Sequence, residues 1–316
     1  MQALITGGSG FIGGHLAKAL FEKGNTVTVL DDLSSGKKRN LASLMNSSDF
    51  QFILADCRNP ARVRRAVKNA DTVFHFAANP EVRHELSSPK QTYERNIKAT
   101  FVLLEEIRRH KTDRIVFASS STVYGDATQI PTPVSYGPLK PISVYGATKL
   151  GCEAMVSSYC STFGKKGIIL RFANVIGPRS SHGVIHDFYR KLKRDSSELQ
   201  VLGDGKQSKS YLYIDDCIDA ILKAFESSNE KTAIFNVGSE DMINVTDIAK
   251  IVIKELGLKE TELHFSGGVD GGRGWRGDVK TMLLDLKEIK ALGWKPELNS
   301  RSAVEKTVHE INAANP

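Results

Sequence analysis

The stretch "QALITGGSGFIGGHLAKALFEKGNTVTVLDD", residues 2 to 32, alternates apolar runs with glycines in a regular order. Residues 3–6 and 26–30 are short apolar or β-branched runs, as is typical of strands. Residues 11–23 carry apolar side chains at helical spacing, and Gly24 ends that pattern. The segment therefore predicts a strand, a glycine-rich turn, a helix and a second strand, which is the order found in dinucleotide-binding units.

Each of three glycines in this turn has a physical reason to be glycine. Gly7 permits a tight turn, Gly10 lets backbone amides approach a pyrophosphate, and Gly13 lets the helix pack closely on the strand. The amino end of the helix also favours negative charge. A phosphate loop of the G-x-x-x-x-G-K-[ST] type is excluded because that pattern does not occur in the chain.

Asp31 closes the second strand, 21 residues after Gly10. A carboxylate at this place accepts hydrogen bonds from the ribose hydroxyls of adenosine and repels a 2′-phosphate. The expected cofactor is therefore NAD rather than NADP. The residues predicted to line it in this unit are Gly7, Gly10, Phe11, Ile12, Gly13, Asp31, Asp32, Ser34 and Ser35.

The chain continues to alternate between strand and helix patterns. Strands are predicted at residues 50–54, 72–76, 114–118 and 167–172, and helices at residues 62–68 and 91–109. This alternation predicts an α/β fold with a parallel, doubly wound sheet (Rossmann type). Because the regularity ends at "NVIGP", we expect an NAD-binding domain over residues 1–173, with returning segments near 211–238. Residues 174–316 should form most of a smaller α/β lobe that binds the substrate.

Composition is typical of a cytoplasmic globular protein. The chain has 316 residues, of which 41% are hydrophobic and 25% charged. No apolar run approaches the roughly 20 residues of a membrane span, so we expect no membrane association. Four cysteines lie without C-x-x-C spacing and should be reduced thiols, and eight histidines form no metal-binding motif.

The formal net charge of +7 raises the question of a nucleic-acid partner. Basic clusters at residues 37–39, 62–65, 108–109 and 191–194 are spread along the chain and interleaved with acids. Each is expected to be a solvated face, so we do not expect a nucleic-acid-binding protein. The electrostatic field of a positively charged chain would also favour an anionic nucleotide substrate.

The segment "SVYGATK", residues 143 to 149, places Tyr145 and Lys149 four positions apart. The pattern downstream to Phe163 predicts a helix, on which residues at this spacing share a face. Tyrosine is ordinarily a poor base at neutral pH, and a neighbouring cation stabilises its phenolate. On spacing alone, a packed tyrosine ring beside a solvated lysine is the more common arrangement.

The segment "IVFASSSTVYG", residues 115 to 125, places serines at the carboxyl end of a predicted strand. Ligands bind at this end of open α/β sheets, and a serine hydroxyl there can share a substrate oxygen with a tyrosine. A simple strand-to-loop turn would use the same residue types. Together with the nucleotide-binding unit and the tyrosine–lysine pair, the catalytic interpretation is favoured.

Six segments, in order, give nearly the whole chain a family resemblance. They are T-G-G-x-G-F-I-G, "HFAANPEV", "SSSTVYG", "YGATK", "RFANVIGP" and "GRGWRGDV". The chain resembles the extended short-chain dehydrogenase/reductases, and among them the UDP-galactose (UDP-glucose) 4-epimerases of the compact archaeal type. The glycine motif and Y-x-x-x-K are shared by the superfamily, whereas the serine loop and the last motif are typical of its sugar-nucleotide branch.

The resemblance implies a role for each matching residue. Tyr145 would be the base, Lys149 would support its ionised form and bond the nicotinamide ribose, and Ser120 would bond the sugar 4-hydroxyl. The further cofactor contacts that it implies are those of Asp56, Cys57, Ala77, Ala78, Asn96 and Phe172. The substrate contacts that it implies are those of Pro80, Thr122, Asn174, Val184, Ile185, Lys209, Arg273 and Asp278.

Three positions depart from many relatives. Lys209-Ser210 stands where they carry Arg-Asp, so the bidentate grip of an arginine on phosphate is lost there. Pro80 replaces a lysine of many bacterial epimerases. Met282 replaces a bulky tyrosine that restricts N-acetylated sugars in some relatives, and a flexible methionine leaves both kinds of sugar open.

The implied reaction is NAD-dependent 4-epimerisation of a UDP-hexose, from UDP-galactose to UDP-glucose, through a transient 4-keto sugar, by a homodimer. One alternative is a nucleotide-sugar 4,6-dehydratase or decarboxylase. Dehydratases typically carry Asp-Glu after the serine or threonine of the serine loop, whereas Thr122-Val123 stand here. The other is a non-catalytic, NAD-bound RNA-binding or regulatory protein, which would not need Ser120, Tyr145 and Lys149 together.

Overall fold

The computed structural model describes residues 1–80, 88–180, 182–228 and 230–314, and its contacts divide the chain into two compact units. The first unit comprises Met1–Val123, Val144–Arg171 and Ile221–Phe235, and the second comprises Tyr124–Ser143, Phe172–Ala220 and Asn236–Pro316. The boundary nearest to residue 173 lies between Arg171 and Phe172, and residues 124–143, within the range expected for the NAD-binding domain, belong to the second unit. The segment Tyr211–Tyr213 lies in the second unit, whereas the sequence had placed it with the first.

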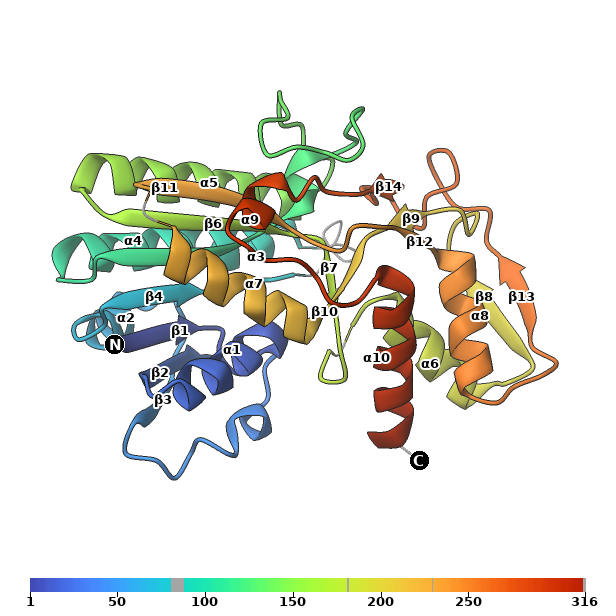
Figure 1. The fold of residues 1–316 in the computed structure, drawn as a ribbon, viewed down its shortest axis with the longest axis horizontal. Coiled ribbons are helices and arrows are strands. Elements are labelled where there is room, and N and C mark those ends of the chain that lie inside the picture. The colour runs from blue at the N-terminus through green and yellow to red at the C-terminus, as the bar shows by residue number, and fades with distance from the viewer. Residues whose placement is uncertain (81–87, 181, 229, 315–316) are drawn as a thin grey trace. The chain divides into compact units, whose positions relative to one another are not determined.

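The first unit is built from parallel strands with helices on both faces (Figure 1). Its strands are β1 (Gln2–Thr6), β2 (Thr26–Asp31), β3 (Phe50–Leu54), β4 (Thr72–His75), β5 (Arg114–Ser120) and most of β6 (Lys166–Phe172) and β11 (Thr232–Val237). Its helices are α1 (Phe11–Glu22), α2 (Pro60–Val67), α3 (Pro89–Tyr93), α4 (Ala99–Arg109), α5 (Val144–Phe163), the later part of α7 (Ile214–Ser227) and the short η1 (Lys38–Leu41).

The strands form one 7-stranded sheet in the order β11-β6-β5-β4-β1-β2-β3. In its middle, Ile5 of β1 pairs with Val29 of β2 on one side and with Phe74 of β4 on the other. The strand order runs outward in opposite directions from β1 and β4, so their carboxyl ends flank the point at which such sheets bind ligands. The predicted parallel, doubly wound α/β fold is confirmed.

The segment predicted as one helix over residues 91–109 is interrupted. A π-helix, Glu94–Lys98, separates α3 from α4. A wider turn of this kind changes the direction in which side chains point, and such turns are frequent at functional sites. Because apolar spacing does not reveal an extra residue in one turn, the sequence pattern could not predict it.

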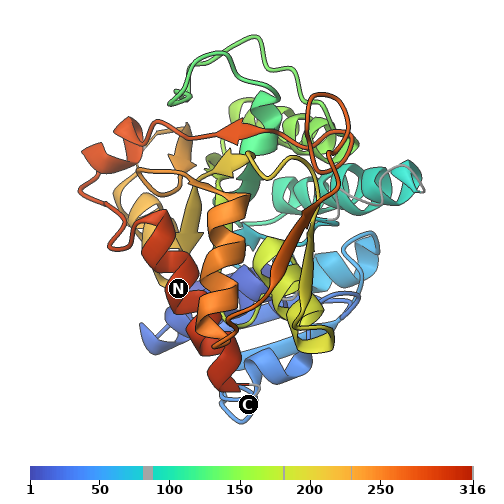
Figure 2. The ribbon, with the colours of Figure 1, turned by 90° about the vertical axis from the view of Figure 1, so that its right-hand side faces the viewer.

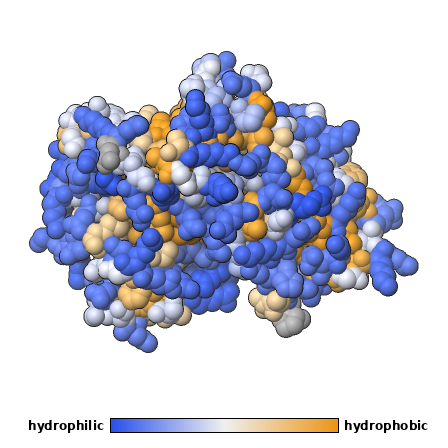
Figure 3. All heavy atoms as spheres, in the orientation of Figure 1, coloured by the Kyte–Doolittle hydropathy of each residue, from blue (hydrophilic) through white to orange (hydrophobic). Residues whose placement is uncertain are grey.

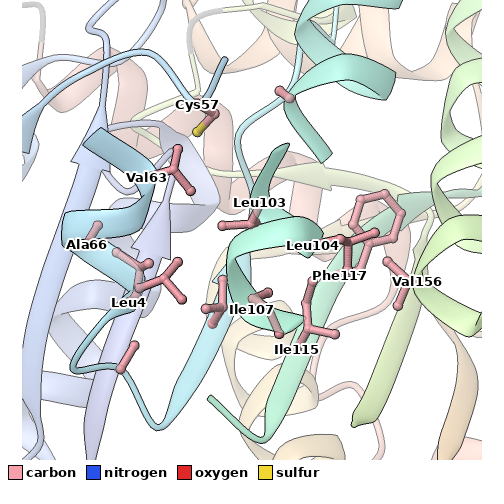
Figure 4. Packing of buried hydrophobic residues seen from close by; sticks show 14 of the residues in the cluster. Leu4, Cys57, Val63, Ala66, Leu103, Leu104, Ile107, Ile115, Phe117 and Val156 are labelled. Carbon is pink, nitrogen blue, oxygen red and sulfur yellow. The ribbon is translucent and has the colours of Figure 1, made fainter. Parts of the chain in front are cut away.

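A hydrophobic cluster fills the space between the sheet and the helices α2, α4 and α5 (Figure 4). Leu4 and Ile115 come from strands, and Val63, Leu103 and Val156 come from the three helices. All five are fully buried, and burying a side chain of this size contributes about 1.5–3 kcal/mol. This packing fixes α5, which carries the tyrosine–lysine pair, against the sheet.

The second unit combines small sheets with helices. Its strands are β7 (Asn174–Ile176), β8 (Glu198–Val201), β9 (Ser208–Lys209), β10 (Tyr211–Tyr213), β12 (Ile243–Asn244), β13 (Glu262–Phe265) and β14 (Thr281–Met282). Its helices are α6 (Val184–Arg194), the start of α7, α8 (Val245–Glu255), α9 (Lys287–Ala291) and α10 (Ser300–Ala314). Helix α8, orange in Figure 2, packs between α6 and the red α10.

The face of the molecule drawn in Figure 3 is mostly hydrophilic, with small hydrophobic patches between polar residues. Within the described ranges, no helix is both long enough and apolar enough to cross a membrane. The four cysteines are buried free thiols.

Candidate active site

The glycine-rich turn lies between the end of β1 and the start of α1. Gly7 has a φ of +72°, and a Cβ there would lie 2.6 Å from the backbone nitrogen of Ala77. A Cβ on Gly13 would overlap the carbonyl oxygen of Gly7 and lie 2.9 Å from Gly8 Cα. Gly10 is the N-cap of α1 and makes no side-chain bond to the first turn. An anionic group can therefore approach the amides of that turn closely.

Asp31 is buried at the end of β2, beside this turn. Its Oδ2 accepts from the backbone nitrogen of Ser9 at 2.9 Å, and its Oδ1 accepts from that of Leu33 at 2.8 Å. Burial raises the pKa of the carboxyl group above its usual value, and these two bonds partly oppose the effect. Since a carboxylate has about four acceptor positions, capacity remains for ribose hydroxyls.

Asp32, Ser34 and Ser35 follow Asp31 in the loop after β2. The Asp32 carboxylate accepts from the backbone nitrogen of Ser34 at 2.9 Å. Arg95 donates to the Ser34 hydroxyl at 2.7 Å. The loop after β2 is thus tied to the π-helix that carries Arg95.

Asp56 and Cys57, expected near the adenine, follow β3. The Asp56 carboxylate pairs with Arg58 at 2.7 Å, and Arg58 also pairs with Glu94 at 2.8 Å. The Arg58 guanidinium lowers the pKa of Asp56, whereas burial raises the pKa of the Cys57 thiol well above its usual value. Cys57 is therefore a packed thiol rather than a reactive one.

Asn96, in the π-helix, is buried and bonds to two functional segments. Its Nδ2 donates to Thr148 Oγ1 at 2.9 Å, and its Oδ1 accepts from the Asn79 backbone nitrogen at 2.7 Å. Ala77 and Ala78, just before Asn79, are partly exposed. Asn96 thus bonds to the loop after β4 and to the helix that carries Lys149.

Tyr145 and Lys149 share one face of α5. The Lys149 ammonium lies 5.7 Å from the centroid of the Tyr145 ring and 5.0 Å from that of Phe117. Its Nζ donates to the carbonyl oxygen of Ala118 on β5 at 2.8 Å, and only 3% of the residue is exposed. The structure therefore contradicts the solvated lysine of the alternative arrangement: this cation is held between the tyrosine and the end of β5.

If Lys149 stabilises the Tyr145 phenolate, as the resemblance implies, the rate of the implied epimerisation should fall at alkaline pH. Burial lowers its pKa to about 8, while Cys152 and Glu153 partly oppose the effect. A lysine is protonated below its pKa, so the charge that stabilises a phenolate is present below about pH 8 and lost above it. We expect kcat, measured from about pH 6 to about pH 10, to fall on the alkaline side with an apparent pKa near the lowered value of Lys149. A profile that stays flat over this range would contradict this role.

Ser120 ends β5, two residues beyond the carbonyl that binds Lys149. The Ser120 Oγ accepts from the backbone nitrogen of Thr122 at 3.2 Å and from the Thr122 hydroxyl at 3.0 Å. The neighbouring Ser119 is buried and donates to Glu153 at 2.5 Å. Glu153 in turn binds Arg171 at 2.7 Å in a buried ion pair. The ends of β5 and β6 are thereby fixed to the middle of α5, beside the candidate catalytic residues.

Glu153 and Arg171 were missed at the sequence level, although one signal was present. Glu153 follows Lys149 by four residues and so continues the face that begins at Tyr145. A buried charge needs a partner, and Arg171 lies within the motif "RFANVIGP". The pairing of these two residues could have been proposed on that ground.

The structure brings Lys209, Arg273 and Asp278 together in the second unit. Lys209 Nζ lies 2.5 Å from an oxygen of the buried Asp278 carboxylate and 5.6 Å from the Trp275 ring centroid. Arg273 Nη1 donates to the Asp278 carbonyl. The sequence did not predict one further partner: Asp126, whose carboxylate binds the Arg273 guanidinium at 2.9 and 3.0 Å.

Asn174, Val184 and Ile185 lie on β7 and at the start of α6. Ile185 is buried, and Val184 is partly exposed. The Asn174 Nδ2 is buried without a hydrogen-bond partner among the described residues. Because an unsatisfied buried donor costs free energy, an acceptor such as a phosphate oxygen would be favourable there.

The remaining predicted positions are less informative. Pro80 is exposed, and the last two residues of its motif, 81 and 82, lie outside the described residues. Phe172 is buried at the end of β6, and Met282 is buried on β14 in register with Lys209. Across the described ranges, no three His, Cys, Asp or Glu side chains are grouped so that they could hold a metal ion.

Comparison with known proteins gives consistent matches. Residues 3–238 match the NAD dependent epimerase/dehydratase family. A putative UDP-glucose 4-epimerase of Methanocaldococcus jannaschii is 32% identical over 97% of this chain and 97% of its own. A crystal structure of a UDP-galactose 4-epimerase is 42% identical, with a TM-score of 0.89 and full coverage of both chains. The UDP-glucose 4-epimerase of Thermus thermophilus, solved with NAD, is 30% identical, with a TM-score of 0.87 over 99% and 100% of the two chains.

Similar solved structures also include epimerases that are named for other UDP-sugars. They include a UDP-N-acetylglucosamine 4-epimerase of Methanobrevibacter ruminantium, at 28% identity, and a UDP-glucuronic acid 4-epimerase of Bacillus cereus, at 29%. The TM-scores are 0.87 and 0.89, with 99% of this chain covered in each case and 98% and 100% of the other chain.

Proposed function

Because the chain belongs to the NAD dependent epimerase/dehydratase family, we propose that it inverts carbon 4 of a UDP-hexose, interconverting UDP-galactose and UDP-glucose. The observation that carries the proposal is the position of Lys149, buried between the Tyr145 ring and the end of β5. A buried ammonium group beside a tyrosine ring favours the phenolate of that tyrosine, and cofactor binding alone does not require the lysine to lie next to the ring.

NAD is the cofactor of this family, and the first unit has residues that fit it. Gly10 leaves the first turn of α1 without a side-chain cap, so its amides are open to a pyrophosphate, and Asp31 has acceptor capacity beside it. When bound, NAD supplies the chemistry of taking a hydride from carbon 4 and returning it. The residues of the chain have to hold the sugar and move the proton of its 4-hydroxyl.

Tyr145 is the proposed base for the 4-hydroxyl. Lys149 supplies the positive charge that favours its phenolate and prepares it to accept the proton. Ser120 is proposed to bond the same substrate oxygen, in a loop held by Thr122 and by the ion pair of Glu153 with Arg171. Proton transfer by a positioned side chain typically contributes about 10²- to 10⁴-fold to a rate.

The second unit is proposed to hold the UDP moiety. Lys209 and Arg273 supply positive charge for the diphosphate, and Asn174 supplies a buried donor that lacks a protein partner among the described residues. Val184 and Ile185 are proposed to border the uridine, and Asp278 to bond its ribose. Held in this way by its nucleotide, the hexose can keep few contacts of its own, which would allow it to present either face for inversion.

The acceptance of N-acetylated sugars is a finer part of the proposal. Relatives of similar identity include enzymes described as acting on UDP-glucose, UDP-N-acetylglucosamine and UDP-glucuronic acid. Met282, buried on β14 beside Lys209, has the flexibility to adapt to different groups. We infer that UDP-galactose and UDP-glucose are the preferred pair. Met282 leaves the site open to N-acetylated sugars, and the experiment below compares the two kinds of substrate.

The proposal is tested by incubating purified protein with UDP-galactose, without added reductant, and resolving the products by NMR. The expected result is an equilibrium mixture with UDP-glucose, in which deuterium placed on carbon 4 is retained. Parallel reactions with the N-acetylated sugars measure the preference. A 4-keto-6-deoxy product would move the chain to the dehydratases, and no conversion of any UDP-sugar would overturn the proposal.

We also infer a homodimer, which the family resemblance implies, from exposed hydrophobic residues on neighbouring helices. Tyr93, Phe101 and Phe163, on α3, α4 and α5, are large hydrophobic residues that are exposed. Both α3 and α4 contact α5, so these side chains lie on helices that pack together, and a contiguous apolar patch is typical of an association surface. Light scattering of the purified protein would contradict this inference if it gave a monomer mass.

A further inference from the structure

We propose that Asp126 competes with the diphosphate of the substrate for Arg273 and so sets the affinity of the site for nucleotide. The inference rests on the proposed function, because it takes a nucleoside diphosphate as the ligand. It assigns a role to a residue that directly follows the serine loop and lies in none of the motifs used above. Both Asp126 and Arg273 belong to the second unit.

The guanidinium of Arg273 is almost fully used within the protein. Its two terminal nitrogens donate to the two oxygens of Asp126 at 3.0 and 2.9 Å. Nη1 also donates to the Asp278 carbonyl, and Nε donates to the Asp270 carbonyl at 3.2 Å. Of the five N–H groups of an arginine, these bonds occupy four. A phosphate that takes the usual two-pronged grip on this side chain must therefore displace Asp126.

The backbone holds Arg273 in place, so the carboxylate is the partner that can leave. Arg273 and Val269 exchange two backbone hydrogen bonds, at 2.8 and 3.0 Å. The Arg273 side chain is 19% exposed, whereas that of Asp126 is 49% exposed. An exposed carboxylate can turn into water at small cost, which a buried one cannot.

The charges of the cluster support the same conclusion. Lys209 and Arg273 carry two positive charges, and Asp278 and Asp126 carry two negative ones, so the four together are neutral. Asp278 is buried and paired with Lys209, and it stays in place. When Asp126 moves away, the cluster becomes net positive, which favours a ligand with two or more negative charges.

The experiment compares the binding of UDP and of uridine to the full chain by titration calorimetry. Asp126→Asn keeps the size of the side chain and removes its charge. We expect Asp126→Asn to bind UDP roughly two- to five-fold more tightly than the natural chain, the range expected for an exposed ion pair. Uridine, which has no phosphate, should bind equally to both, and the difference for UDP should shrink with added salt.

A matched control removes another acid of the same unit. Glu240 forms an exposed ion pair with Lys290, and Glu240→Gln should leave UDP affinity unchanged. Equal or weaker UDP binding by Asp126→Asn would overturn the inference and make Asp126 a support for Arg273. Absence of UDP binding by the natural chain would instead overturn the proposed function, so the two failures are distinguishable.

Discussion

Tyr145→Phe is expected to lower kcat by about 10²- to 10⁴-fold, the usual contribution of a positioned proton-transfer group. The substitution keeps the ring that lies beside Lys149 and removes only the hydroxyl that would take the proton. Binding of NAD and UDP should therefore be retained. Turnover of UDP-galactose, with UDP affinity measured on the same sample, checks both parts.

Tyr159→Phe is the matched control for this substitution. Tyr159 lies on the same helix, and its hydroxyl bonds to Glu105 at 2.9 Å. It has no proposed part in the reaction, so its variant should keep near-normal kcat. If Tyr145→Phe kept more than a tenth of the natural rate while Tyr159→Phe was normal, Tyr145 could not be the base.

Gly13→Ala is expected to lower the amount of NAD that stays bound through purification. It should also lower the free energy of unfolding by about 1–3 kcal/mol, because overpacking a well-packed site is destabilising. Its Cβ would overlap the carbonyl oxygen of Gly7 and crowd Gly8. Backbone atoms cannot turn aside as a side chain can, so α1 has to move away from the turn. Cofactor content after purification and a thermal unfolding curve measure the two effects.

Gly14→Ala provides the control one residue further along α1. A Cβ there would meet the Asn40 Cβ and the Gly8 carbonyl oxygen at an ordinary 3.5 Å. Because alanine also favours a helix over glycine by about 1 kcal/mol, this variant should be as stable as the natural chain or more so. Equal cofactor content in the two variants would show that the close contact at Gly13 is not needed for NAD.

The first unit could be predicted because its signals are local. Strands such as β2 carry a β-branched or apolar run of the right length at residues 26–30, and the α1 segment carries both its glycines and its apolar spacing. The resemblance then added the roles of Tyr145 and Lys149. The burial of Lys149 was not predictable from spacing, since it depends on a bond to Ala118, 31 residues away.

The second unit was harder to predict for a physical reason. Three of its strands, β9, β12 and β14, have 2 residues each, too few for any alternation to be detected. The partner of Arg273 lies 147 residues away, at Asp126, with no pattern to join the two. Such pairs depend on how loops are placed by the surrounding structure, so they emerge only from the structure itself.

The division of the chain affects the order in which the protein can be completed during synthesis. The first unit is complete only at Phe235, because its last strand, β11, is synthesised after β7 to β10. In the sheet, β11 lies at the edge beside β6. Until that strand leaves the ribosome, β6 is an open edge that could pair with other chains. A nascent or truncated chain that ends at residue 173 should therefore be prone to aggregation, even though it contains every residue of the glycine turn and the tyrosine–lysine pair.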